Sequence, residues 1–244
     1  MIFEKQYPID TIHLDCFGRA KASSLLLFAQ EAAAGHCQEL SLDWDTLAKQ
    51  GLFWAVLRHK VLISRLPVAG DTITLQTWPM PTTRVAFPRS CVAFDQNGQE
   101  VFRSVSIWVL MDTKTRNMVL PGKSGIELTG TLRGNELEIP ASLHPALYEN
   151  RDCRQVRFCD LDRNGHMNNT RYLDWIDDLL QSSFHAEHPV REITVCYLSE
   201  AKEGDLLELN WGVSEDSVLQ VDARRTSTNV HPEKERVFAA QLVF

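Results

Sequence analysis

Hydrophobic and polar positions alternate in runs that recur along this chain of 244 residues, as in strands with one buried face. Four β-branched or aromatic runs in the first half predict strands near Phe53–Ile63, Asp71–Pro79, Thr83–Phe94 and Val101–Asp112. Four more in the second half lie near Arg191–Leu198, Asp205–Val213, Val218–Thr226 and Arg236–Phe244. Each half also opens with a short alternating segment, around Glu4–Ile9 and Arg154–Phe158. An Asn-Gly pair inside Asp95–Glu100 predicts a hairpin turn.

Helical spacing appears once in each half, before the four long strands. The first helix follows Gly18, and its apolar positions are Leu25, Leu26, Phe28, Ala32 and Ala33. The second is predicted to be capped by Asn169 or Thr170, and its apolar positions are Tyr172, Ile176, Leu179 and Leu180.

The two halves align as an internal repeat of low identity. Asp15 and Gly18 lie over Asp162 and Gly165 at an offset of 147, and Gly70 lies over Gly204 at an offset of 134. The first half therefore has extra residues, which we place near Cys37–Gly51.

One strand, a helix and then four strands is the element order of the hot-dog fold, in which a mostly antiparallel sheet wraps around a central helix. We therefore predict an α+β protein with a tandem hot-dog fold, made of repeats at residues 1–125 and 147–244. Residues 126–146, rich in Gly, Pro and polar residues, are the predicted linker. A generic α+β protein with a coincidental repeat is the alternative.

Composition narrows the function classes. The net charge of −7 gives no reason to expect nucleic-acid binding, and no run approaches the roughly 18 apolar residues that a membrane span needs. The first residues do not resemble an export signal, so we expect a cytosolic protein. Six cysteines without a C-x-x-C pair fit reduced, mostly packed thiols better than disulfides or a zinc site, and we expect no metal and no cofactor.

The candidate chemistry lies just before the second helix, where Asp162, Asn164 and His166 occupy alternate positions. In an extended segment these side chains share one face, beside the positive end of the helix dipole. Acyl transfer to water needs a base to activate the water, donors for the developing oxyanion and an acid for the leaving group, and these three residue types can supply such groups. Each residue also has an alternative structural role. Asp162 could cap a turn, Asn164 with Gly165 could form a turn, and His166 could be a cap or a surface group.

Glu200 is the fourth candidate, because the repeat aligns it with Leu66. A carboxylate where the fold accepts leucine is either solvent-exposed or placed in a cleft as a base. The first repeat carries Asp15, Phe17 and Arg19 at the three other places, so the fold does not require Asn or His there.

Three motifs in order resemble the acyl-acyl carrier protein thioesterases, the plant plastid enzymes and their bacterial relatives that end fatty-acid synthesis. They are DLDRNGHMNNTRYLDW (Asp160–Trp175), SVSIWVLMDTKTR (Ser104–Arg116) and YLSEA (Tyr197–Ala201). The resemblance runs along nearly the whole chain. It implies catalytic residues Asp162, Asn164, His166 and Glu200 in the second repeat, and a fatty-acyl pocket shaped largely by the first. Our own hypothesis is that the extra residues near Cys37–Gly51 help to form the wall of this pocket.

The resemblance also implies hydrolysis of fatty acyl-acyl carrier protein thioesters by water attack, with an acyl carrier protein bearing a fatty-acyl phosphopantetheine as partner. Plant members often have Cys after the catalytic Glu, whereas Ala201 stands here, which excludes a cysteine nucleophile at this position. No plastid transit peptide precedes the first repeat, which points to a bacterial cytosolic enzyme. Arg58, Lys60, Arg84 and Arg89 are candidates for a basic patch that docks the acidic carrier protein. The sequence also allows a homodimer.

Three alternatives remain open from the residues: a hot-dog thioesterase acting on acyl-coenzyme A, a hydratase acting on enoyl thioesters, and a non-catalytic acyl-binding regulator. Within the mechanism, the base is Glu200, alone or with Asp162, and the oxyanion donors are Asn164 and His166. Asp162 is otherwise the group that fixes the His166 tautomer.

Overall fold

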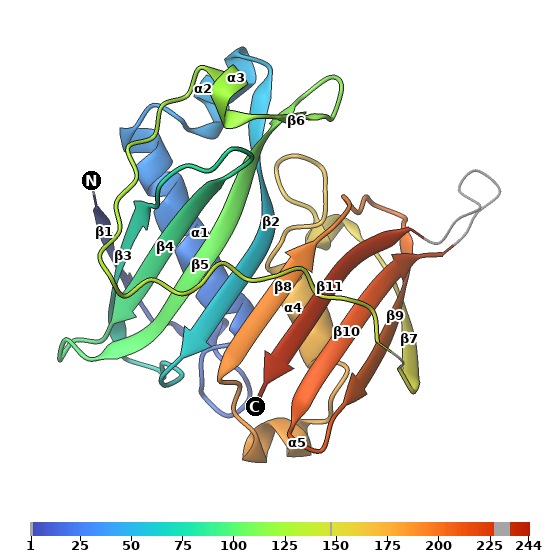
Figure 1. Ribbon diagram of the computed structural model, residues 1–244. Helices are drawn as coiled ribbons and strands as arrows, with labels where there is room; N and C mark the ends of the chain where they lie inside the picture. The colour runs from blue at the N-terminus through green and yellow to red at the C-terminus, as the bar shows by residue number, and fades with distance from the viewer. Residues whose placement is uncertain (1, 147, 227–234) are drawn as a thin grey trace. The chain divides into compact units, whose positions relative to one another are not determined.

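The computed structural model describes residues 2–146, 148–226 and 235–244, and the chain divides into two compact units, residues 1–140 and 141–244 (Figure 1). This boundary falls inside residues 126–146, the predicted linker. Every helix in those three described stretches is too short or too polar to cross a lipid bilayer.

The first unit is an antiparallel sheet in the order β1-β3-β4-β5-β2, with the short β6 paired to β5. Its elements are β1 (Phe3–Pro8), the 3-10 turn η1 (Thr11–His13), α1 (Ala22–Glu39), α2 (Trp44–Lys49), β2 (Leu52–Ile63), β3 (Thr72–Pro79), β4 (Phe87–Phe94), β5 (Glu100–Asp112), β6 (Met118–Val119) and α3 (Pro121–Ser124). The predicted strands are confirmed, except that Thr83–Ala86 is a turn closed by the Thr83 N–H on the Ala86 carbonyl.

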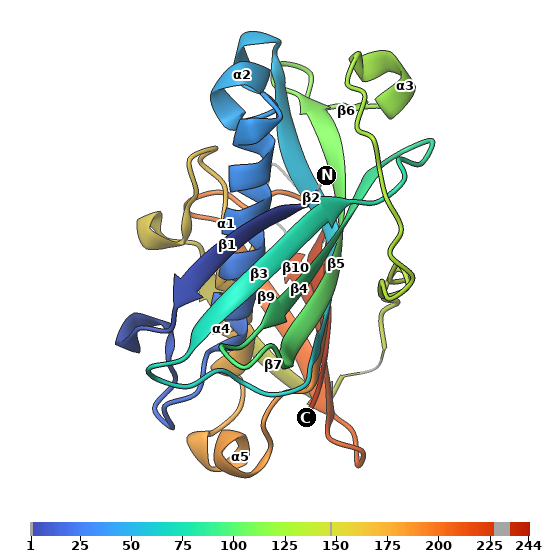
Figure 2. The same ribbon diagram turned by 90° about the vertical axis from the view of Figure 1, so that its left-hand side faces the viewer.

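Helix α1 lies along one face of this sheet (Figure 2). Its five predicted apolar positions are all buried, and Leu25 and Ala32 have no exposed surface. They pack toward a sheet whose inward residues are equally buried, including Ile73, Leu75 and Phe102. Burial of this apolar surface is the main stabilising term of the unit.

A polar cluster interrupts the core between α1 and β4. The Arg89 guanidinium donates to Nδ1 of His36 (3.1 Å) and to Oγ1 of Thr77 (3.3 Å). Burial, and then the nearby Arg89 charge, lower the pKa of His36 to about 4, so this imidazole is neutral at pH 7. Arg89 is only 7% exposed, which corrects its place among the candidates for a docking patch.

The residues absent from the second repeat form α2, which is capped by the Asp43 carboxylate on the N–H groups of Asp45 and Thr46. Leu47 of this helix has no exposed surface and packs with Leu52, Phe87 and Leu110 in a small separate core. The insertion is therefore a structured addition to the sheet.

The segment after α3 follows the face of the sheet opposite α1 (Figure 2). Thr131 donates its N–H to the Pro79 carbonyl (3.0 Å), and Arg58 donates to the Pro140 carbonyl (2.8 Å). A Cβ on Gly130 would lie 2.2 Å from the Met80 carbonyl carbon, so only glycine permits this approach. Residues 125–140 are thus bound along the sheet, whereas their composition is typical of a flexible linker.

The second unit repeats the plan with sheet order β8-β11-β10-β9-β7. Its elements are β7 (Asn150–Gln155), the 3-10 turn η2 (Phe158–Asp160), α4 (Arg171–Asp177), α5 (Ser182–Glu187), β8 (Glu192–Tyr197), β9 (Leu206–Val213), β10 (Val218–Arg225) and β11 (Arg236–Val243). The four long strands are confirmed. The opening strand β7 begins four residues before the predicted segment at Arg154–Phe158 and overlaps it only at its end, and four of its six positions are exposed.

Helix α4 lies behind this sheet (Figure 1), and Tyr172 packs against Phe238 of β11 with ring centroids 4.6 Å apart. The helix is shorter than predicted. Leu179 and Leu180 lie outside it, because their N–H groups bond to carbonyls three residues back and tighten the last turn. Thr170 is the N-cap residue, but its side chain makes no capping bond.

The cysteines differ in part from the prediction. All six are free thiols, but Cys16, Cys153 and Cys159 are exposed, and only Cys91 and Cys196 are buried. The expectation that most of them are packed is therefore wrong.

Candidate active site

The Asp162–His166 segment is a closed loop rather than an extended strand. Leu161 and Met167 form an isolated antiparallel bridge, and the Asp162 N–H donates to the His166 carbonyl (2.7 Å). Gly165 has φ +73°, which suits glycine at the turn. The prediction that three side chains share one face of an extended segment is therefore wrong, although the loop still gathers them.

The Asp162 carboxylate holds this loop together. Its Oδ1 accepts the N–H of Asn164 (2.8 Å) and of His166 (3.3 Å), and its Oδ2 accepts the Asn164 side-chain amide (3.2 Å). A carboxylate that bonds the backbone two and four residues ahead stabilises a turn in place of a strand. Asp162 is thus a structural acceptor, and Asn164 is oriented by it.

The loop in turn directs the His166 ring toward Glu200. Nε2 of His166 lies 3.2 Å from Oε2 of Glu200, and the two side chains are 14% and 36% exposed. Both groups are therefore partly screened from solvent yet reachable by water. Residues that lie far apart in sequence meet here in a base and acid arrangement of the kind used for proton transfer.

The same loop in the first repeat serves as an internal comparison. Oδ1 of Asp15 accepts the N–H groups of Phe17 (2.8 Å) and Arg19 (2.9 Å), and Gly18 has φ +76°. Here, however, Arg19 returns to Oδ2 of Asp15 (3.1 Å). The Asp is thus required by the loop in both repeats, whereas Asn164 and His166 are specific to the second.

Glu200 lies in the connection from β8 to β9, and the backbone of this connection is held from several sides. Ala201 accepts the Met167 N–H (2.8 Å), which joins the connection to the loop. The hydroxyl of Tyr197 donates to the Asn169 carbonyl (3.0 Å), and burial of that phenol raises its pKa. The first repeat has the same link, from the Ala20 N–H to the Pro67 carbonyl (2.7 Å), so the alignment of Glu200 with Leu66 is supported.

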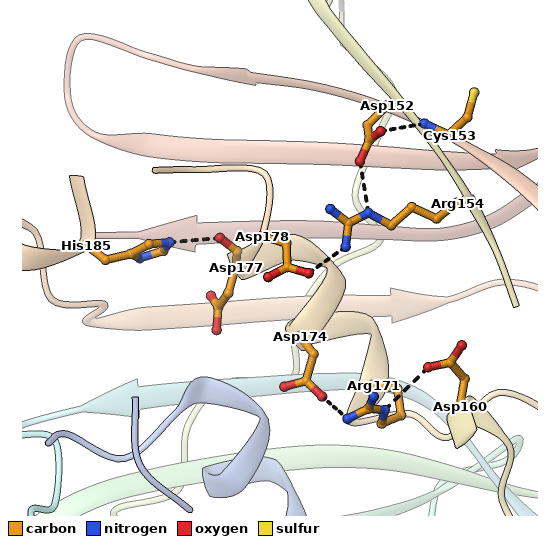
Figure 3. A network of polar contacts seen from close by, with 9 residues as sticks. All are labelled: Asp152, Cys153, Arg154, Asp160, Arg171, Asp174, Asp177, Asp178 and His185. Atoms are coloured by element: carbon orange, nitrogen blue, oxygen red, sulfur yellow. Dashed lines mark hydrogen bonds and ion pairs between the residues drawn. The ribbon is translucent and has the colours of Figure 1, made fainter. Parts of the chain in front are cut away.

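Charged pairs anchor α4 at both ends (Figure 3). Arg171 lies 3.5 Å from the buried Asp160 and also pairs with Asp174, while Asp178 pairs with Arg154 of β7 (2.7 Å). Asp160 is the residue whose carbonyl accepts the Asn168 N–H (2.8 Å) just after the loop. These pairs fix the helix relative to the loop.

Two absences bear on the chemistry. The described residues contain no group of three His, Cys, Asp or Glu side chains placed to hold a metal ion. The position after Glu200 is Ala201, only 1% exposed, and it offers no thiol.

Sequence reasoning missed one residue of the site, Arg225 of β10. Its guanidinium donates to the Glu200 carbonyl (2.6 Å), and no sequence signal distinguishes it from other arginines at strand ends.

The fold and the site together define a double hot-dog protein in which one repeat carries a histidine-carboxylate pair. Two family models match in tandem, the acyl-ACP thioesterase N-terminal domain over residues 1–120 and the acyl-ACP thioesterase C-terminal domain over residues 147–236, where ACP is acyl carrier protein. The chain belongs to the acyl-ACP thioesterase family.

Relatives and solved structures agree with this assignment. A palmitoyl-acyl carrier protein thioesterase from Gossypium hirsutum is 24% identical over 89% of this chain and 56% of its own length. An acyl-ACP thioesterase from Bacteroides thetaiotaomicron has a TM-score of 0.88 at 22% identity, covering 100% of this chain and 97% of its own. A 12:0-ACP thioesterase from Umbellularia californica has a TM-score of 0.82 at 21% identity, covering 99% and 96%.

The chain spans about half the length of the first curated relatives it matches. At 22% and 21% identity, the likeness to the two solved structures shows the double hot-dog fold.

Proposed function

We propose that this chain hydrolyses fatty acyl-ACP thioesters to free fatty acid and carrier protein by direct attack of water. The observation that carries the proposal is the 3.2 Å contact between His166 and Glu200, beside an Asn164 that Asp162 orients. The relatives named as acyl carrier protein thioesterases support the same substrate class.

Glu200 is the group to which we assign water activation. Its carboxylate is partly exposed and takes a proton as the water oxygen bonds to the thioester carbon. Asn164 donates a hydrogen bond to the oxygen on which negative charge develops. The carbon–sulfur bond then breaks, and the departing thiolate receives a proton through His166.

Asp162 receives a positioning role in this scheme. Because its two oxygens accept three hydrogen bonds inside the loop, and because Asp15 does the same work in the first repeat, its carboxylate is already occupied in the free protein. This supports Glu200 alone as the base, among the alternatives that the sequence leaves open.

The first repeat is the part to which we assign the acyl chain. It has Phe17 and Arg19 in the places of Asn164 and His166, and Leu66 in the place of Glu200, so it lacks the catalytic set. The acyl carrier protein as partner, homodimer formation and a bacterial cytosolic location stay predictions. The curated relatives are named as chloroplastic proteins.

One assay tests the proposal against its alternatives. The same acyl chains, from short to long and both saturated and α,β-unsaturated, are offered on acyl carrier protein and on coenzyme A. Thiol release is followed with a thiol-reactive dye, and the products are identified. We expect free fatty acid and a higher kcat/KM for the carrier protein substrate. A preference for coenzyme A, a hydrated acyl product, or binding without thiol release would each contradict the proposal and support one of the three alternatives.

A further inference from the structure

The backbone around Glu200 copies that of the first repeat almost contact for contact. Leu198 and Ser199 both donate to the Val237 carbonyl, as Ser64 and Arg65 do to Val101. Further along, the N–H of Lys202 bonds to Oδ2 of Asp205 at 3.0 Å, and the N–H of Val68 bonds to Oδ2 of Asp71 at 3.1 Å.

The two repeats differ in the residue that supplies a guanidinium to Asp71 and to Asp205. In the first repeat the guanidinium on Asp71 belongs to Arg65, within the connection itself, and its other arm reaches Asp95 (3.0 Å). In the second repeat Ser199 stands at that place, and the guanidinium on Asp205 comes from Arg225 at the end of β10.

Because the guanidinium of Arg225 comes from β10, it also reaches a main-chain partner that Arg65 does not have among the described residues. Nη2 of Arg225 donates to the main-chain carbonyl of Glu200 (2.6 Å), while its Nε donates to Asp205 (3.1 Å) and its Nη1 pairs with Glu235. The Arg225 side chain is only 14% exposed. A charge-assisted bond of this kind, held in a planar fork, fixes geometry better than a neutral one.

We propose that Arg225 is a positioning residue that holds the backbone of Glu200 so that its carboxylate stays within reach of His166. The inference rests on the proposed function, because it assigns Arg225 a role through Glu200. Leu66, the counterpart of Glu200, needs no such placement, and Arg65 spans Asp71 and Asp95 instead.

Three variants test the proposal: Arg225→Met, which keeps the length and loses the donors, Arg225→Lys, which keeps the charge, and Arg65→Met as the matched control. We expect Arg225→Met to lower kcat by roughly 10- to 100-fold with little change in KM, because small misplacements of reacting groups have effects of that size. Arg225→Lys should recover part of that loss. Arg65→Met should lower the melting temperature comparably and leave kcat near the wild-type value.

Crystal structures of the variants supply a readout that does not depend on activity. We expect the contact between Nε2 of His166 and Oε2 of Glu200 to lengthen in Arg225→Met and to persist in Arg65→Met. An unchanged contact with unchanged kcat in Arg225→Met overturns the proposal, as does an equal kcat loss in Arg65→Met. If the wild-type protein releases no thiol from any acyl thioester, the proposed function fails, and the length of the contact still decides the role of Arg225.

Discussion

At the scale of single residues, we expect the contact between His166 and Glu200 to be the part of the site most sensitive to substitution. Replacing either residue by alanine is expected to lower kcat by roughly 10²–10⁴, the range for a general acid–base group or an oxyanion donor. Steady-state turnover of an acyl-ACP substrate measures the effect, with circular dichroism as the check on folding. A folded variant that turns over at near the wild-type rate would refute the assignment.

Asp162 and Asp15 offer a second residue-scale prediction, because the same loop occurs with and without the candidate catalytic groups. Alanine at either position leaves two loop N–H groups without their acceptor, so we expect each variant to lose about 1–3 kcal/mol of unfolding free energy. Only Asp162→Ala should also lower kcat.

The variant Asp162→Asn separates a positioning role of Asp162 from a role as the catalytic base. Asp162→Asn keeps one oxygen for the backbone N–H groups, so we expect it to retain the fold and kcat within about 10-fold, since a general base contributes more than that. Denaturant unfolding and turnover assays measure the two effects. A folded Asp162→Asn protein that loses turnover as severely as Glu200→Gln would make Asp162 the base.

The residue types of the site were predictable from the sequence, whereas their geometry was only partly so. Alternation placed Asp162, Asn164 and His166 on one face of a strand, but the Asp162 side chain competes for the backbone N–H groups and closes a loop. The Asn164-Gly165 pair signalled that turn. Arg225 was not predictable, because its partner is a main-chain carbonyl, which any residue at position 200 would present.

At the scale of elements, periodicity predicted the long strands well because their buried faces alternate cleanly. It failed where other forces set the boundary. Helix α4 ends at Asp177 although Leu179 and Leu180 continue the apolar pattern, because the chain tightens into bonds between residues three apart. Composition likewise suggested a flexible linker, whereas side chains of the sheet bind residues 125–140 through backbone carbonyls that have no sequence signature.

Two buried histidines, one on α1 and one on β2, predict that the stability of the first unit depends on pH. Burial lowers the pKa of His59 on β2 to about 4, as burial and Arg89 do for His36 on α1. The ordinary value of 6.5 applies in the unfolded chain, so between pH 6.5 and 4 the unfolded state binds protons that the folded state does not. Stability is thus fully present above about pH 6.5 and is lost as the pH falls.

Denaturant unfolding from pH 7 to 4.5 measures this effect, and each histidine is expected to contribute up to roughly 3 kcal/mol over the full interval. Carboxylates with lowered pKa, such as Asp95 and Asp112, act below their ordinary value of 3.8 and therefore outside this window. The double variant His36→Gln and His59→Gln should flatten the dependence. A curve as steep in that variant as in the wild type would show that other groups are responsible.

At the scale of the whole molecule, the two units preserve one set of backbone contacts under little sequence identity. Val156 donates its N–H to the Asp205 carbonyl and accepts the N–H of Gly204, as Ile9 does with Asp71 and Gly70, and both glycines have positive φ. Because main-chain bonds do not depend on side-chain identity, the repeat keeps its fold while its charged and polar positions diverge. This explains why the tandem architecture was predictable from a few glycines and aspartates.

The net charge of the chain makes the sign of the salt dependence informative. At −7 overall, the protein repels an acidic partner at long range, so added salt should raise kcat/KM unless a local basic surface steers the encounter. Of the four candidate residues, Arg89 is buried and Arg58 is bound to the Pro140 carbonyl, whereas Arg84 is exposed.

We expect kcat/KM for an acyl-ACP substrate to fall as the salt concentration rises. The Arg84→Glu variant should lower kcat/KM about 10-fold at low salt and flatten its dependence on salt. Charge reversal of the exposed Lys123 on α3 is the matched control, and an uncharged acyl-pantetheine should show no salt effect in any variant. A rise of kcat/KM with salt in the wild type would mean that overall repulsion dominates and that no basic docking surface operates.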